Sequence, residues 1–523
     1  MEFKDLNELE NATSRGRKEM FRFGTAMLFI VMIILFTSNM NIGTGSVSIE
    51  LVIAAMIGGY MALNIGANDV ANNVGPAVGS KALTLTGAII LAAIFETAGA
   101  LIAGGDVVST IKKGIIDPAL VADPETFIWL MMAALLAGAL WLNLATAMGA
   151  PVSTTHSIVG GVLGAGIAAA GWNIANWDKM GAIAASWVIS PVIGGIIAAS
   201  FLMWIKRSIT YKEDMISAAK KTVPLLIAIM AWAFSTYLIM KGLKKIWKVD
   251  FITALLIGLA IAAVVYASVK PLIARQAERL ANAKTSINTL FTIPLIFAAA
   301  LLSFAHGAND VANAVGPLAA IHDALQSNEI HSKAEIPLWI MVIGALGISL
   351  GLLLFGPKLI RTVGSEITEL DQMRAFSIAM AAAITVIVAS QLGLPVSSTH
   401  IAVGGIFGVG FLREYLKRSY AKAIQEIKDH HQGEDEALVN QFIADFSKAS
   451  VAQKKVMLTQ LKAHKAEVEL SKKERKSLNK VYQKELVKRS AFLKIVAAWV
   501  ITVPASAFLA AMIFFAIRGM MLP

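Results

Sequence analysis

Two short polar blocks carry the residue types that could bind ions in an otherwise apolar chain. The block at 66–76 reads Gly-Ala-Asn-Asp-Val-Ala-Asn-Asn-Val-Gly-Pro, and the block at 307–317 repeats it with a single change. Carboxylate and amide oxygens are hard ligands for cations, although Asn and Asp also cap broken helices and bond to neighbouring ones. We predict two related cation-binding or coupling sites made of Asn68, Asp69, Asn72, Asn309, Asp310 and Asn313.

A second pair of blocks has the pattern of a helix start. Residues 151–156 read Pro-Val-Ser-Thr-Thr-His and residues 395–400 read Pro-Val-Ser-Ser-Thr-His, each followed by a Gly-Gly pair. The N-terminus of a helix presents unpaired N–H groups and the positive end of the helix dipole, which suits an oxyanion. Hydroxyl-rich helix starts are also common packing devices. The predicted anion-binding residues are Ser153, Thr154, Thr155, Ser397, Ser398 and Thr399.

The blocks recur in the same order, which indicates a duplicated unit. The first pair is 241 residues apart and the second pair is 244 residues apart. A weaker third pair keeps the order, with Trp187 to Pro191 matched by Trp499 to Pro504. Interrupted apolar segments at corresponding places in two halves are typical of a transporter that binds its substrate between repeats.

The charges of the blocks favour coupled transport over a channel. Lysine and arginine are absent from the matched blocks, apart from Lys81 at the edge of the first. Desolvation makes a bare anion prohibitively costly in the middle of a membrane. We therefore expect co-transported cations, held by Asp69 and Asp310, to neutralise the anion.

Four further titratable residues lie inside or beside the apolar runs. Glu96 lies within the run at 84–105, and a carboxylate at that depth indicates a functional site. It could carry a proton or bind a cation, or it could bond to a neighbouring helix. His156, His306 and His400 border the polar blocks, where each could titrate or pack against its neighbours.

The composition is that of a polytopic membrane protein. The chain has 523 residues, 56% of them hydrophobic and 15% charged, with a mean hydropathy of +0.67. It lacks cysteine, which excludes disulfides and thiolate metal sites. Eleven runs are long enough to span a bilayer: 21–38, 49–66, 84–105, 127–147, 181–204, 222–240, 250–268, 290–306, 337–356, 374–392 and 493–516. The shorter Gly-rich stretches at 157–171 and 401–411 could be half-helices.

The net charge of +11 does not indicate nucleic acid, because it is concentrated in one segment. Residues 413–494 hold 19 Lys and Arg against 11 Asp and Glu, which supplies +8 of the total. Acidic residues are interleaved throughout this segment. We expect a solvated helical hairpin there, with a regulatory module or a contact with anionic lipid as the alternative.

The distribution of basic residues gives an orientation. Four basic residues lie in the first twenty positions and none lies in the connection at 39–48, so the positive-inside bias places the N-terminus in the cytoplasm. The basic connections at 205–221 and 270–284 also fit the cytoplasm. The second copy then enters the membrane from the side opposite to the first. The basic connection at 241–248 does not fit this pattern.

The predicted fold is an all-α polytopic membrane protein with two inverted repeats, whose broken or re-entrant helices surround a central site. A charged helical cytoplasmic insertion is added to the second repeat. The predicted parts are a cytoplasmic N-terminus with a first span (1–48), repeat 1 (49–204), a connecting region with two spans (205–289), the first part of repeat 2 (290–412), the insertion (413–491) and a final span (492–523).

The duplicated blocks resemble the signature of the PiT family of inorganic phosphate transporters. The resemblance covers roughly 49–204 and 290–516, and it includes Phe95-Glu96-Thr97-Ala98-Gly99 and the stretch from Leu359 to Gly364. It implies cation-coupled uptake of inorganic phosphate across the plasma (inner) membrane by alternating access, with phosphate and cations held near the midplane. It implies no enzymatic activity and no cofactor beyond co-transported Na⁺ or H⁺.

Several alternatives remain open at this point. The substrate could be another oxyanion such as sulfate, or a neutral metal-phosphate complex. A phosphate sensor that signals through residues 413–491 is a different class, and an intramembrane hydrolase is disfavoured because no nucleophile and base are suitably spaced. The expected partners are phosphate, a monovalent cation and the lipid bilayer; the choice between Na⁺ and H⁺ and the formation of a homodimer are left open.

Overall fold

The computed structural model describes residues 3–40, 48–105, 114–242, 249–330, 336–366, 369–392, 396–429 and 489–521. Most of the predicted insertion lies outside the described residues. So do Pro395 and most of the basic connection at 241–248.

The described chain is helical, apart from an isolated β-bridge between Ile116 and Ala175. The first half contains α1 (Phe3–Thr37), α2 (Ile49–Asn68), α3 (Ala71–Gly79), α4 (Leu85–Ala103), α6 (Pro124–Met148), α7 (Thr154–Ala170), α8 (Trp177–Ile205), α9 (Met215–Tyr237) and α10 (Phe251–Glu278). The second half contains α11 (Lys284–Thr289), α12 (Thr292–Asp310), α13 (Ala312–Ser327), α14 (Leu338–Phe355), α15 (Pro357–Arg361), α16 (Gln372–Gln391), α17 (Ser398–Asp429) and α21 (Arg489–Met521). Two short 3₁₀ helices are η1 (Pro118–Leu120) and η2 (Trp172–Ile174), and three short π-helical segments are η3 (Lys206–Thr210), η4 (Leu238–Gly242) and η5 (Thr362–Glu366).

Eleven segments of the described chain are long and apolar enough to cross a membrane, which confirms the predicted all-α polytopic class. Each overlaps one of the eleven runs expected from hydropathy. The two Gly-rich stretches differ in length. Helix α7 ends at Ala170, close to the expected limit, whereas α17 continues to Asp429 and so extends into the predicted insertion.

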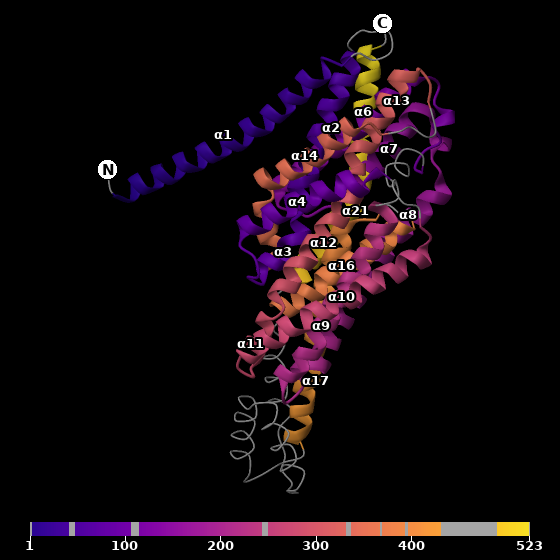
Figure 1. The fold of residues 1–523 in the computed structure, drawn as a ribbon. Helices are drawn as coiled ribbons and strands as arrows, with labels where there is room; N and C mark the ends of the chain where they lie inside the picture. Colours follow the sequence, from indigo (N-terminus) through magenta and orange to yellow (C-terminus); the bar gives the residue numbers. More distant parts are fainter. Residues whose placement is uncertain are drawn as a thin grey trace.

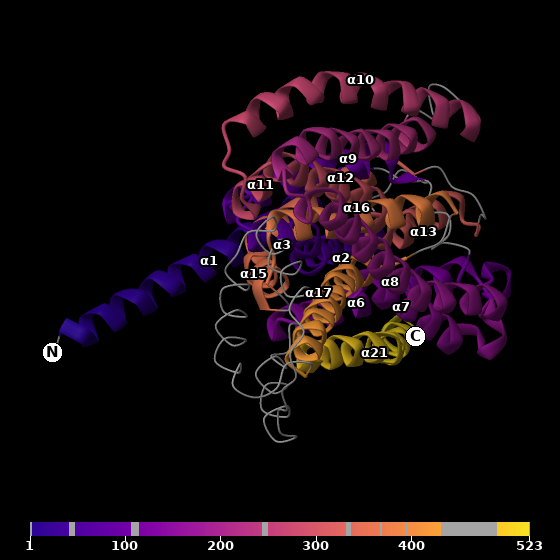
Figure 2. The ribbon, with the colours of Figure 1, turned by 90° about the horizontal axis from the view of Figure 1, so that it is seen from below.

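The helices form an elongated bundle with two projecting helices and further helices at its periphery. The N-terminal part of α1 points away from the bundle, and α17 leaves its lower end (Figure 1). Seen from below, α10 is the outermost helix on one side, with α9 between it and the rest, while α21 lies on the opposite side (Figure 2). These peripheral helices enclose the segments that carry the polar blocks.

Helices of one copy pack directly against helices of the other copy. Helix α2 of the first copy packs on α14 of the second, and α12 of the second packs on α4 of the first. In the same way, α7 packs on α21, and α17 packs on α8. Each contact has a partner with the roles of the copies reversed, as expected of two related units that share one core.

Glycines make these contacts between copies close. A Cβ on Gly66 of α2 would lie 1.8 Å from the carbonyl oxygen of Ile348, and a Cβ on Gly307 of α12 would lie 2.2 Å from that of Glu96. Gly66 and Gly307 hold the same place in the two repeated blocks, so Glu96 and Ile348 are equivalent residues. Small residues that let helix backbones touch are the usual packing device of membrane helices.

Each polar block is a short break between two helices. Helix α2 ends at Asn68 and α3 starts at Ala71; correspondingly, α12 ends at Asp310 and α13 starts at Ala312. Pro76 and Pro317 follow inside α3 and α13. Proline has no N–H to donate to the carbonyl four residues earlier, which belongs to Asn72 in the first block. Such breaks persist in a membrane only where protein, water or ligand satisfies the freed groups.

We predict that Gly66→Ala and Gly351→Ala each destabilise the fold, because the added methyl overlaps a backbone carbonyl of the facing helix. Overpacking of this kind costs about 1–3 kcal/mol. Thermal unfolding of the purified protein in detergent measures the effect. Gly181→Ala in α8 is the matched control, because nothing lies within 4 Å of its added Cβ. Equal unfolding temperatures for all three variants would contradict the close packing.

Candidate functional site

Two buried carboxylates are held in the same way in the two copies. The hydroxyl of Thr154 donates to Asp69 Oδ2 at 2.7 Å, and the hydroxyl of Ser398 donates to Asp310 Oδ2 at 2.7 Å. Each bond joins a broken-helix block to the helix start of the same copy. The structure therefore brings together the two kinds of block that the sequence singled out.

The asparagines connect one copy to the other. The side-chain amide of Asn72 donates to Thr399 Oγ1 at 2.9 Å, across the interface between the copies. Asn313 makes the reciprocal contacts, donating to Thr154 Oγ1 at 3.1 Å and to Thr155 Oγ1 at 3.3 Å. Both copies thus contribute to a single central network.

The first asparagine of each block holds the loop before the helix start. Asn68 donates to the carbonyl of Ala150 at 3.2 Å and accepts from the N–H of Val152 at 3.0 Å. Asn309 donates to the carbonyl of Val396 at 3.3 Å and to Asp310 Oδ1 at 2.8 Å. For Asn68 the geometry is that of a residue that positions the predicted anion-binding loop.

Ser153 and Ser397 are the N-caps of α7 and α17. Their hydroxyl oxygens accept the N–H groups of His156 at 3.1 Å and His400 at 3.2 Å. Capping uses the oxygen and leaves the hydroxyl hydrogen able to donate. The two helix starts adjoin, because Thr155 Oγ1 lies 3.3 Å from the carbonyl oxygen of Val396.

Glu96 joins the network through His306. The Glu96 carboxylate lies 2.7 Å from His306 Nδ1 and accepts the side-chain amide of Asn73 at 2.8 Å. On its other side, His306 Nε2 lies 2.6 Å from Asp310 Oδ2 and 3.8 Å from Asp69 Oδ2. Asp69, His306 and Asp310 form a buried group with ligand atoms close enough to share one cation.

This extension of the network joins the two copies and has no counterpart at the equivalent positions. Aligning the repeated blocks pairs His306 with Ile65 and Asn73 with Ala314, and the glycine contacts pair Glu96 with Ile348. All three differences convert apolar residues to polar ones at one place. The difference between Ile65 and His306, just before the repeated blocks, is visible in the sequence. The sequence does not show that His306 contacts Glu96, and the role of His306 depends on this contact.

The remaining two histidines pack rather than extend the network. The His156 ring stacks 3.8 Å from Trp187, and the His400 ring stacks 3.7 Å from Trp499. The two imidazoles meet at a centroid distance of 4.3 Å. The third sequence pair, the matched tryptophans, is thereby explained as part of the core just behind the helix starts.

The network is enclosed by protein, since each predicted site residue is at most 2% exposed. The side-chain oxygens of Asn72 and Asn309 are buried and have no hydrogen-bond partner among the described residues. Oxygen atoms of this kind are available to a hard cation. The anion-binding and cation-binding groups predicted from the sequence therefore lie next to one another.

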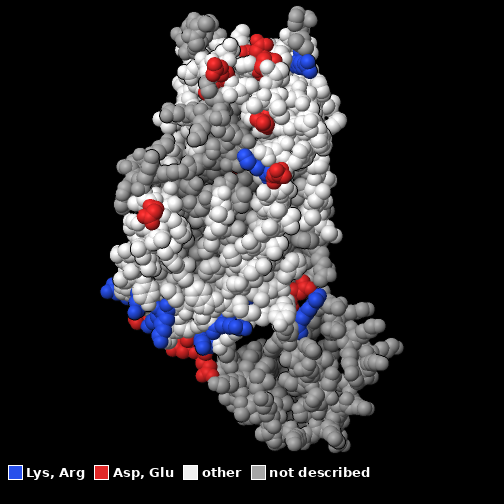
Figure 3. All heavy atoms as spheres, turned by 90° about the vertical axis from the view of Figure 1, so that its right-hand side faces the viewer, with Lys and Arg blue, Asp and Glu red and all other residues white. Residues whose placement is uncertain are grey.

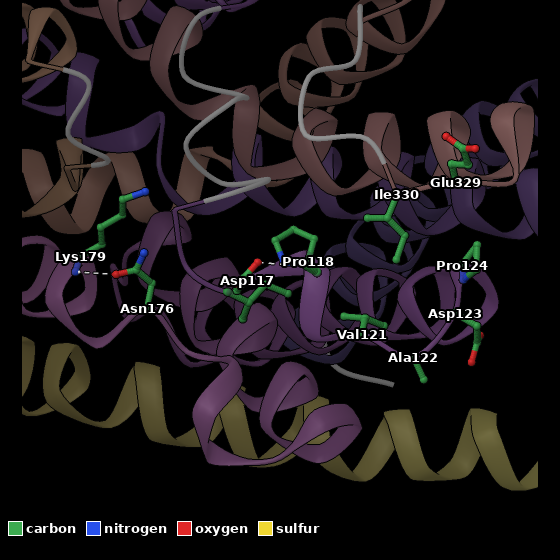
Figure 4. A pocket seen from close by; sticks show the side chains of 12 residues that line it. Asp117, Pro118, Val121, Ala122, Asp123, Pro124, Asn176, Lys179, Glu329 and Ile330 are labelled. Carbon is green, nitrogen blue, oxygen red and sulfur yellow. Dashed lines mark hydrogen bonds between the residues drawn. The ribbon is translucent and has the colours of Figure 1, made fainter.

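A separate open pocket of about 640 Å³ lies at the end of the bundle away from α17. Its lining includes Asp117, Asp123, Lys179 and Glu329 (Figure 4). Asp117 and Asp123 cap the turns that follow them, accepting the N–H groups of Ala119 and Thr126. The pocket is distinct from the buried network, and these two acids have a structural use.

Two related copies that enclose carboxylates, amides and helix starts inside a helical membrane protein are the arrangement expected of a transporter. The chain belongs to the phosphate transporter family, whose match covers residues 65–510.

Individual relatives agree with the family. The chain is 53% identical over 99% of both sequences to a "Putative phosphate permease" of Helicobacter pylori (strain J99 / ATCC 700824). It is 39% identical to another of the same description from Pyrococcus abyssi (strain GE5 / Orsay), over 69% of this chain and 89% of the relative. A solved structure of a sodium-dependent phosphate transporter matches with a TM-score of 0.73 and 30% identity, covering 91% of this chain and 100% of the other.

We predict that Glu96→Ile destabilises the protein, because it leaves His306 Nδ1 and the amide of Asn73 without their acceptor. An unsatisfied buried group costs about 1–3 kcal/mol. The triple variant Glu96→Ile, His306→Ile and Asn73→Ala, which introduces the apolar residues of the equivalent positions Ile348, Ile65 and Ala314, should unfold at a higher temperature than the single variant. A triple variant no more stable than Glu96→Ile would contradict the proposed dependence among the three side chains.

Proposed function

We propose that this protein imports inorganic phosphate together with Na⁺ by alternating access of two inverted repeats. The observation that carries the proposal is the pair of 2.7 Å bonds from Thr154 to Asp69 and from Ser398 to Asp310. They set an anion-binding helix start beside a cation-binding carboxylate in each copy. Phosphate and its counter-ions can then occupy one shared site.

The anion is held by helix starts and hydroxyl groups. Phosphate oxygens accept from the free N–H groups of α7 and α17 and from the hydroxyls of Ser153, Thr155, Ser397 and Thr399. Thr154 and Ser398 line the same site, with their hydroxyls donating to Asp69 and Asp310. The positive ends of both helix dipoles favour negative charge at this place. The network includes no lysine or arginine among the described residues that form it, so the fold itself supplies little compensating charge.

The charge balance makes cations obligatory. Asp69, Asp310 and Glu96 are buried with His306 as the one basic side chain of the network. A phosphate dianion added to these carboxylates is too costly to desolvate without further positive charge. Na⁺ bound by Asp69 and Asp310, with the free oxygens of Asn72 and Asn309, supplies it. The sodium dependence of the 30% identical solved structure supports Na⁺ as the ion at these positions.

Glu96 and His306 provide a third coupling position, which has no counterpart at the equivalent residues Ile348 and Ile65. A proton or a further cation held between them changes the charge beside Asp310 by one unit. This position leaves H⁺ coupling as the alternative to Na⁺, and the two ions are separated by the transport experiment below.

The surface charge supports the proposed orientation. On the face seen in Figure 3, lysine and arginine side chains gather at the lower end, while acidic residues predominate at the upper end. By the positive-inside bias the lower end is cytoplasmic, together with the N-terminus and the insertion at 413–491. In this arrangement the parts 49–204 and 290–412, completed by 492–523, act as the two repeats, with 1–48 and 205–289 as the peripheral spans in the plasma (inner) membrane.

We expect Asp69→Asn and Asp310→Asn each to lower Na⁺-driven phosphate uptake at least roughly tenfold, because each removes a charged cation ligand; tenfold corresponds to about 1.4 kcal/mol. Radiolabelled phosphate uptake into proteoliposomes is measured under an imposed Na⁺ gradient and, separately, under an imposed pH gradient. Asp250→Asn is the matched control, since Asp250 is an exposed cap of α10. Uptake driven equally well by the pH gradient alone in the wild type would remove Na⁺ from the proposal.

We expect Ser153→Ala and Ser397→Ala to raise the apparent KM for phosphate several-fold, since each removes a hydroxyl donor to the anion and weakens a helix cap by about 1 kcal/mol. Ser268→Ala on the outer helix α10 is the control, because that hydroxyl bonds only to its own helix. Initial rates at varied phosphate give the KM. Strong competition by unlabelled sulfate would assign the site to a broader oxyanion carrier, and absence of any uptake by the intact protein would favour the sensor.

A further inference from the structure

Four basic side chains from four separate segments converge at the lower end of the bundle. Lys206 begins η3 after α8, Lys284 begins α11, Arg374 lies in the first turn of α16, and Arg413 lies in α17. Lys206 is close enough to the other three for their charges to interact, and Lys284 and Arg413 likewise lie within the field of Arg374. We call these four residues the basic cluster.

Few of the described carboxylates lie near the basic cluster. Among the described residues, the acids that interact with it are Glu369 and Asp371. Glu369 is 90% exposed, and its carboxylate is 3.5 Å from Arg413. Asp371 lies 3.3 Å from Arg374 and also caps α16 by accepting the N–H of that residue. The neighbouring Glu414 pairs with Arg418 at 2.5 Å.

Much of the hydrogen bonding of the cluster goes to a neutral group. The backbone carbonyl of Glu369 accepts from Arg413 at 2.7 Å and from Arg374 at 3.1 Å. Arg413 is only 7% exposed, so water screens its charge weakly. Four partly desolvated cations that converge from separate segments, with two carboxylates and one carbonyl beside them among the described residues, form a group that favours an anion.

The cluster lies at the depth of the lipid headgroups. Lys206, Lys284 and Arg374 each fall at the end of a candidate membrane span. Arg413 is fifteen residues after Ser398, which contacts the central carboxylate Asp310; at 1.5 Å per residue this is about 22 Å along α17. Half of the hydrocarbon thickness is about 15 Å, so a guanidinium at this distance from the central site reaches the headgroup region.

The cluster also breaks the symmetry of the two copies. With the 244-residue offset of the Pro-Val-Ser blocks, Arg374 and Arg413 correspond to Leu130 and Ala169. Residues required only by the repeated scaffold would be expected in both copies. The bulky cations are thus specific to one face of the membrane.

We propose that the basic cluster binds a phosphate group at the membrane surface. The chemistry has two sources: the headgroup of an anionic phospholipid such as phosphatidylglycerol, or inorganic phosphate on that side of the membrane. Arginine forks suit phosphate oxygens, and lysine adds a point charge. The site is separate from the central network and does not depend on the proposed transport cycle.

The test compares the double variant Lys206→Gln/Arg374→Gln with the control Arg207→Gln/Arg279→Gln in full-length protein. Arg207 and Arg279 are exposed and lie near the same end of the bundle. Replacing them by glutamine removes the same amount of charge as the cluster variant does. Native mass spectrometry follows the binding of phosphatidylglycerol and of phosphatidylcholine to delipidated protein. Each basic residue near the surface contributes about 1 kcal/mol to the binding of anionic lipid, and 1.4 kcal/mol corresponds to about tenfold in affinity. Loss of two cations in the cluster variant should therefore weaken phosphatidylglycerol binding about 30-fold.

A second arm titrates inorganic phosphate by calorimetry into nanodiscs of phosphatidylcholine, with Ser153→Ala/Ser397→Ala present throughout to weaken the central site. If the cluster variant loses binding of phosphatidylglycerol, the site is assigned to a lipid headgroup. If it loses binding of inorganic phosphate alone, the site is assigned to inorganic phosphate. The charge-conserving variant Lys206→Arg/Arg374→Lys should recover binding, which excludes misfolding. Equal binding by the cluster variant and its control in both arms would overturn the proposal.

Discussion

An ionised carboxylate inside a membrane persists only if nearby groups satisfy its oxygens, and this constraint organises the centre of the protein. Asp69 and Asp310 each accept a hydroxyl from a helix start 2.7 Å away. The helix starts in turn need the broken helices beside them, because both kinds of segment leave backbone groups that lipid cannot satisfy. Neither polar block can therefore be stable at this depth without the other.

The packing of helices of one copy against those of the other follows from the same constraint. Asn72 reaches Thr399 of the other copy, and Asn313 reaches Thr154. A single copy would expose these amides and hydroxyls to hydrocarbon, whereas the pair encloses them. Glycines such as Gly66 and Gly307 bring the helices close enough for the short polar side chains to meet. Close packing and polar satisfaction are thus two aspects of one arrangement.

The sequence predicted the spans and the paired blocks because both depend on local composition. Runs of apolar residues set the eleven spans, and the repetition of Asp69 as Asp310 within identical surroundings marked the carboxylates. The contact between Glu96 and His306 could not be predicted, since it joins residues 210 positions apart in different copies. The same holds for the convergence of Lys206 and Arg413, which depends on how three helix ends meet the middle of α17. The extension of α17 to Asp429 was missed because its charged lower half resembles the insertion that follows.

A symmetric scaffold alone gives no reason to favour one direction or one stoichiometry of transport. Two copies related by the proposed inversion would present equivalent paths to both sides of the membrane. The departures from symmetry therefore carry information that the repeated motifs cannot. Glu96 and His306, opposed by Ile348 and Ile65, place an additional titratable pair beside Asp310 and none at the equivalent position beside Asp69. A charge bound there acts on the two carboxylates unequally, because His306 Nε2 lies 2.6 Å from Asp310 and 3.8 Å from Asp69. The two cation positions of the proposed cycle are thus chemically distinct, even though the helices that carry them are equivalent.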